Sequence, residues 1–107
     1  MRFLMTTTAA DPPDDELVAE MGRLVEEMTR KGVLLAADGL DPVGARVISS
    51  GGKITMTDGP FSGAKETILS FALVEARSKE EVVELARRFW QLVGNGEGAI
   101  RQVYGPE

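Results

Sequence analysis

The stretch ILSFALVEA, residues 68–76, decides how this chain folds, because it is a strand whose side chains are apolar on both faces. Alternate residues of a strand point to opposite faces of a sheet. One face carries Ile68, Ala72 and Val74, and the other carries Leu69, Phe71 and Leu73. Both faces therefore have to be covered by other parts of the protein.

The residues after this strand predict an amphipathic helix. Ser78 and Glu81 have the spacing of a capping box, and Gly94 can end the helix. Its apolar residues recur at helical spacing: Val82, Leu85, Ala86, Phe89, Leu92 and Val93. This stripe can cover one face of the strand.

A second amphipathic helix is predicted before the strand. Its apolar stripe consists of Leu17, Met21, Leu24, Val25 and Met28. Acidic residues 14–16 lie in its first turn, and Arg30 and Lys31 lie in its last, as the helix dipole favours. Gly32 can adopt the left-handed conformation that ends a helix.

Further strands are predicted at residues 2–7, 33–37, 45–50, 53–57 and 99–104. Gly51 and Gly52 suit a two-residue hairpin turn between the third and fourth of these. We expect this hairpin to be peripheral and half-buried. Asn95, Gly96 and Gly98 are interpreted as a turn before the last strand.

The order of these elements predicts one α+β domain over residues 1–107, with a ferredoxin-like β-α-β-β-α-β fold and an inserted β-hairpin. Both helices would lie on one face of an antiparallel sheet. The other face would remain apolar and exposed in a single chain. We therefore expect a homodimer in which two sheets pack face to face.

The composition argues against several classes of function. Twelve Lys and Arg against 17 Asp and Glu leave a net charge of −5, which disfavours nucleic-acid or membrane partners. The chain has no Cys and no His, so thiolate and imidazole chemistry are excluded. We expect no metal and no cofactor. The short apolar run near Met1 is too short for a signal peptide, so we expect a cytoplasmic protein.

The run DGPFSGAKE, residues 58–66, is the densest cluster of special residues. A turn explains it, with Asp58 bonding its own backbone, Gly59 and Pro60 setting the dihedral angles, and Phe61 anchoring the loop. In a functional interpretation, Asp58 and Glu66 form a carboxylate pair for proton transfer. These two are the candidate catalytic residues.

A few side chains outside this run are candidates for a ligand site. Arg101 alternates with Ile100 and Gln102 and could point into a cavity between two sheets. Trp90 and Tyr104 could line a pocket, although an aromatic residue beside a helical stripe or in a terminal strand is more typical of packing. The candidate ligand contacts are Asp58, Gly59, Pro60, Phe61, Arg101 and Tyr104.

The run DGPF, followed after three residues by KE, resembles the signature of the DGPF-domain family of YCII-related proteins. Other stretches resemble that family in order and spacing: MRF, VLLAADGL, GGKITMTDGPF, SKEEVVELARRF and GEGAIRQVYGPE. The resemblance implies a ferredoxin-like fold, a dimeric α+β barrel and a largely unassigned activity. Related proteins have been proposed as enzymes around a His and Asp pair, and this chain has no His. Gly63 also stands where members commonly have Glu.

Two hypotheses follow for the function. The first is a dimeric binding or accessory protein that holds a small ligand in a cavity between the sheets. The alternative is a small cofactor-free enzyme that uses Asp58 as acid or base, assisted by Glu66, Arg101 or Tyr104.

Overall fold

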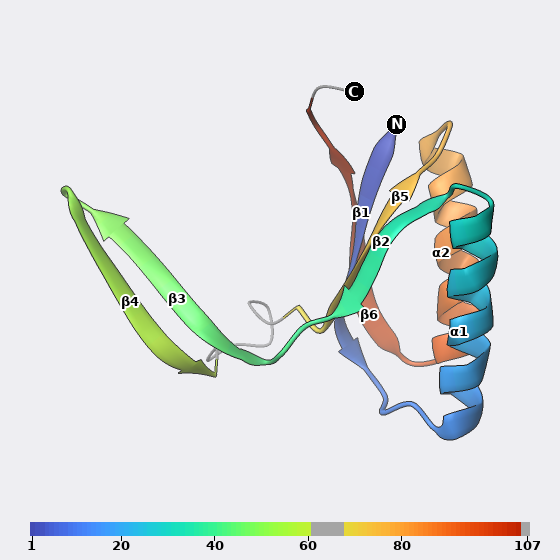
Figure 1. Ribbon diagram of the computed structural model, residues 1–107, viewed down its shortest axis with the longest axis horizontal. Coiled ribbons are helices and arrows are strands. Elements are labelled where there is room, and N and C mark those ends of the chain that lie inside the picture. Colours follow the sequence, from blue (N-terminus) through green and yellow to red (C-terminus); the bar gives the residue numbers. More distant parts are fainter. Residues whose placement is uncertain (61–67, 106–107) are drawn as a thin grey trace.

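The fold is α+β, as predicted, with two helices and antiparallel sheets (Figure 1). The structure is a computed structural model that describes residues 1–60 and 68–105. The elements are β1 (Arg2–Ala10), α1 (Asp15–Arg30), β2 (Leu34–Gly39), β3 (Val43–Ser50), β4 (Lys53–Pro60), β5 (Ser70–Glu75), α2 (Lys79–Val93) and β6 (Gly96–Val103). Neither helix is long and apolar enough to cross a membrane.

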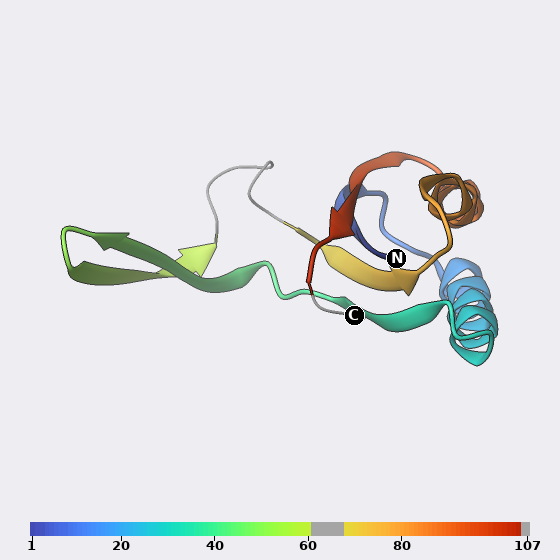
Figure 2. The same ribbon diagram turned by 90° about the horizontal axis from the view of Figure 1, so that it is seen from above.

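The main sheet has the strand order β2-β5-β1-β6, and every neighbouring pair is antiparallel. This order confirms the ferredoxin-like arrangement. Helices α1 and α2 lie side by side on one face of the sheet (Figures 1 and 2). We call this the inner face, and the opposite one the outer face.

The register of β1 and β5 confirms the two apolar faces of β5. Phe3 lies opposite Val74 on the inner face, and Leu4 lies opposite Leu73 on the outer face. Strand β5 is shorter than predicted, because its pairing with β1 begins at Ser70 rather than at Ile68.

The helix ends are where the sequence places them. The Asp14 carboxylate accepts a hydrogen bond from the backbone N–H of Leu17 at 2.8 Å, and the Ser78 hydroxyl accepts one from Glu81 at 3.2 Å. Gly94, with φ of 88°, ends α2. These caps satisfy backbone donors that the first turn of a helix leaves without partners.

The hairpin β3–β4 forms an arm, residues 43–60, that extends away from the helices (Figures 1 and 2). Its turn has positive φ at Gly51 and Gly52, as predicted. Two expectations were wrong. Every arm residue from 43 to 58 is exposed rather than half-buried, because no other element packs on it. Asp58, Gly59 and Pro60 continue β4 instead of forming a turn, because β3 extends to Val43 and pairs with them.

Strand β6 also differs from its prediction, since it begins at Gly96 and not at Ala99. The indole of Trp90 lies directly over this part of the strand. A Cβ atom at Gly96 would come within 2.6 Å of the Trp90 ring, and one at Gly98 within 2.9 Å. The two glycines therefore do not make a turn. They let the strand pass beneath an aromatic ring.

Candidate functional site: a cavity between the helices and the sheet

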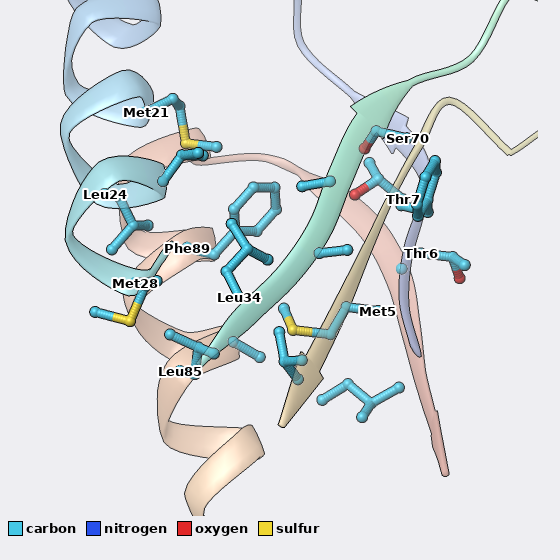
Figure 3. A pocket seen from close by; sticks show the side chains of 18 of the residues that line it. Met5, Thr6, Thr7, Met21, Leu24, Met28, Leu34, Ser70, Leu85 and Phe89 are labelled. Carbon is cyan, nitrogen blue, oxygen red and sulfur yellow. The ribbon is translucent and has the colours of Figure 1, made fainter. Parts of the chain in front are cut away.

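A partly open cavity of about 510 Å³ lies between the inner face of the sheet and the two helices (Figure 3). Its volume falls in the range of small-molecule sites in proteins. The wall is largely apolar, and its larger side chains include Met5, Met21, Leu24, Val25, Met28, Leu34, Leu85, Phe89, Trp90 and Ile100. Such a wall suits a ligand with a mostly apolar surface.

The cavity exists because small residues occupy its floor. Ala37, Ala72 and Gly98 lie on three different strands of the sheet and all face the helices. Their short side chains leave space that the helices do not fill. Three methionines, Met5, Met21 and Met28, can adapt this space to different shapes because their side chains are unbranched and flexible.

Two hydroxyl groups supply polar contacts in this apolar site. Thr7 on β1 and Ser70 on β5 lie directly opposite each other in the sheet and both line the cavity. Figure 3 shows their oxygen atoms together at one end of the cavity. Within residues 1–60 and 68–105, neither hydroxyl has a hydrogen-bond partner. Both are available to a ligand.

The aromatic part of the wall comes from neighbouring residues of α2. The rings of Phe89 and Trp90 meet edge to face, with centroids 5.3 Å apart and an angle of 87°. Trp90 is held over Gly96 and Gly98, so its indole has a defined position in the cavity. The chain contains a single tryptophan, which makes Trp90 a selective optical probe of this site.

An ion pair links the two helices that cover the cavity. Arg88 on α2 donates to the Glu27 carboxylate on α1, with 2.9 Å between Nη1 and Oε2. Lys31 lies 3.4 Å from the same carboxylate. The hydrogen bond from Arg88, together with that from Lys31, lowers the pKa of Glu27 to about 2. This pair lies at the surface and fixes the helices relative to each other.

Comparison with protein families assigns the chain. The model of the YCII-related domain matches residues 1–105. The protein belongs to the YCII-related family. Comparison with curated proteins finds no match.

Among solved structures, this YCII-related chain is similar to 5-chloro-2-hydroxyhydroquinone dehydrochlorinase from Burkholderia phenoliruptrix AC1100, determined in complex with 2,5-dihydroxybenzoquinone. The TM-score is 0.54, over 99% of this chain and 96% of the other. Sequence identity is 17%, so the similarity concerns the fold.

Of the candidate residues of the DGPF run, the three that the structure describes, Asp58, Gly59 and Pro60, do not line the cavity of this YCII-related protein. Asp58 lies exposed on β4, Gly59 has φ of 132°, and Pro60 is the last residue of that strand. Phe61 and Glu66 lie outside the described residues.

The remaining candidates, Arg101 and Tyr104, do not line the cavity either. Arg101 lies opposite Leu4 on the outer face, and Tyr104 follows β6 with 89% of its surface exposed. The fold of one chain therefore does not bring Asp58 together with Arg101 or Tyr104.

Sequence reasoning missed the residues that build the cavity. The sequence pattern places Thr7 only within the predicted strand 2–7. It places Ser70 only within the predicted strand 68–76. A signal was present: the small or hydroxyl residues Ser70 and Ala72 alternate with the large Phe71 and Leu73. Such alternation indicates a strand with one face whose small side chains leave space beneath the helices.

Among the described residues, no group of three or more acidic side chains is placed to bind a metal ion.

Proposed function

We propose that this YCII-related protein is a homodimer that binds a small, largely apolar molecule in the cavity between its helices and sheet. The observation that carries the proposal is the cavity of about 510 Å³, whose wall is largely apolar and includes two adjacent hydroxyls, those of Thr7 and Ser70, without partners among the described residues. An apolar molecule that fills the cavity removes its own surface and that of the cavity wall from water. This removal is the main favourable term in such binding.

The wall favours one class of ligand, a neutral ring that carries one or two oxygen atoms. Phe89 and Trp90 offer aromatic surfaces for a ring, and Thr7 and Ser70 can donate to or accept from its oxygen atoms. Asp38 is the charged residue among the described residues that line the cavity, and no Lys or Arg in the described chain lines it. An anionic ligand would therefore lose its hydration without compensation. The ligand of the similar Burkholderia enzyme, 2,5-dihydroxybenzoquinone, is likewise an oxygenated six-membered ring, but it carries four oxygen atoms and acidic hydroxyls, so it lies outside the neutral class proposed.

The dimer is proposed from the outer face of the sheet. Leu4, Phe71 and Leu73 lie there side by side, and no element of the described chain covers them. An apolar sheet face of this kind is typical of an interface. We expect light scattering to give twice the chain mass of 11.5 kDa.

Ligand binding can be tested by the fluorescence of Trp90 during titration with tetramethyl-1,4-benzoquinone, a neutral ring that carries two oxygen atoms. We expect saturable quenching. Ala37 and Ala36 are adjacent on β2 but pair on opposite faces, with Ala72 and Leu73 respectively. Ala37→Leu should fill the cavity and weaken binding tenfold or more, whereas Ala36→Leu should leave it unchanged. Equal affinity of all three proteins would contradict binding in the cavity.

The same titration tests the two hydroxyls. Thr7→Val and Ser70→Ala remove one hydrogen-bonding group each and keep the wall otherwise similar. Each loss should weaken binding of the quinone about fivefold to tenfold, as expected for about 1 kcal/mol per hydrogen bond. Unchanged affinity in both variants would show that the ligand's oxygen atoms do not lie at this end of the cavity.

A further inference from the structure

The two faces of the arm differ in chemistry. Paired residues of adjacent strands share a face, and Val47 pairs with Met56 while Arg46 pairs with Thr57. The first face consists of Val43, Ala45, Val47, Ser49, Ile54, Met56, Asp58 and the Pro60 position. The second consists of Gly44, Arg46, Ile48, Ser50, Lys53, Thr55, Thr57 and Gly59. We call the first the apolar face of the arm, since the second is mostly polar.

The apolar face of the arm is exposed to water in a single chain. The exposed fractions are 57% for Val47, 66% for Ile54 and 69% for Met56. A two-stranded hairpin is marginally stable by itself. A row of exposed apolar side chains on such a hairpin therefore indicates a surface that packs against a partner.

Asp58 is the one charged residue on this face, and it lies near the base of the arm opposite Ala45. Burying a carboxylate in an apolar contact is costly unless a cation pairs with it. The surface that covers the arm should accordingly offer a positive charge near its base.

The outer face of the main sheet offers such a surface. On β6, Arg101 is a cation of this face, with Leu4 opposite it on β1 and Ala99 and Val103 two residues away on the same side. Arg101 forms no ion pair with any other residue described by the structure. The other cation of the face, Arg2, lies opposite Glu75. The outer face, which also carries Asp38 opposite Phe71, thus combines apolar side chains with a guanidinium that has no carboxylate partner among the described residues.

The position of the arm relative to this face indicates that the partner of the arm is a second copy of the chain. Figures 1 and 2 show the arm extending on the side of the sheet away from the helices, so a second copy seated on the outer face would lie beside it. β2, which leads into the arm, and β6 are the two edges of the sheet. A two-fold axis parallel to the strands places β2 of one copy opposite β6 of the other.

We propose that the arm of each copy packs its apolar face on a second copy of this chain, and that Asp58 pairs there with the partner's Arg101. The inference rests on the dimer proposed above. Two-fold symmetry makes the contact twice, once from each arm. The contact also brings Asp58 next to Arg101. Both are candidate ligand contacts predicted from the sequence, and the fold of a single chain holds them apart.

The absence of cysteine from the chain allows a direct test. Chains with Asp58→Cys and chains with Arg101→Cys, carrying tags of different length, are co-expressed and treated with a short bis-maleimide. We expect a cross-linked heterodimer with both tags, because the long side chain of arginine in an Asp–Arg pair holds the backbones farther apart than a disulfide allows but within reach of this reagent. Thr57→Cys is the matched control, since Thr57 points to the other face of the arm and should not link to Arg101→Cys.

A charge exchange tests the same contact without cross-linking. D58R and R101D should each weaken the dimer tenfold or more in analytical ultracentrifugation, and the double variant should recover affinity to within a few fold. A dimer that shows no 58–101 link, or that links Thr57→Cys equally well, overturns the arm contact and leaves the proposed dimer and ligand site in place. A monomer at all concentrations overturns both the arm contact and the dimer, while quinone quenching still reports on the cavity.

Discussion

The two ends of the space between helices and sheet are built from the same elements, yet one is packed and the other is hollow. On the inner face of β1, Phe3 is buried at the packed end and Thr7 lies at the hollow end. On β5 the corresponding residues are Val74, which is 1% exposed and borders the cavity, and Ser70. The difference is one of side-chain volume, because backbone geometry is shared. The packed side chains are thereby concentrated at one end, and the other end keeps an unfilled volume.

The largest expected effect comes from replacing a phenylalanine with alanine at each end of this space and comparing the two losses of stability. Phe3→Ala removes a ring that is 3% exposed and packed on Val74 and Val82, so the free energy of unfolding should fall by about 3–5 kcal/mol. Phe89→Ala extends a space that already exists and should cost about 1–2 kcal/mol. Urea unfolding measures both. Equal losses would show that the two ends contribute alike.

An intermediate effect is expected at the floor of the hollow end. Gly98→Ala places a methyl group 2.9 Å from the Trp90 ring and against the backbone of β1, so stability should fall by about 1–3 kcal/mol and the Trp90 emission should shift. Gly105→Ala is the control, since a Cβ there meets nothing within 4 Å. A Gly98→Ala protein with normal emission and stability would show that the indole does not rest on this strand.

The smallest effect concerns the ion pair between the helices. The pKa of Glu27 is lowered in the folded protein to about 2 from an ordinary 4.5, so its contribution to stability is complete above pH 4.5 and is lost as pH falls toward 2. Glu27→Gln should therefore be less stable than the native protein at pH 7, with the difference shrinking at pH 3 and in high salt.

Glu26→Gln is the matched control for that measurement, because Glu26 is exposed on the same helix and forms no ion pair with the described residues. It should behave like the native protein at both pH values. A difference between native protein and Glu27→Gln that stays constant from pH 7 to pH 3 would contradict a role for the lowered pKa.

Local features of the fold could be predicted because near neighbours in the sequence produce them. The caps at Asp14 and Ser78 need only the following turn of helix, and the hairpin turn needs only Gly51 and Gly52. The interpretation of Asp58 to Pro60 as a turn failed for the opposite reason. Those residues have turn chemistry of their own, but pairing with Val43 to Ala45 holds them in a strand.

The amino-acid sequence by itself determined the family, the order of elements and the two-sided character of β5, since these depend on periodicity and on motifs read along the chain. Only the tertiary structure decided where a ligand could bind. Thr7, Ser70, Trp90 and Gly98 come from four elements, and nothing in their spacing marks them as neighbours. The cavity they line is a volume left unfilled between a sheet and two helices, and such a volume exists only after long-range packing has placed its walls.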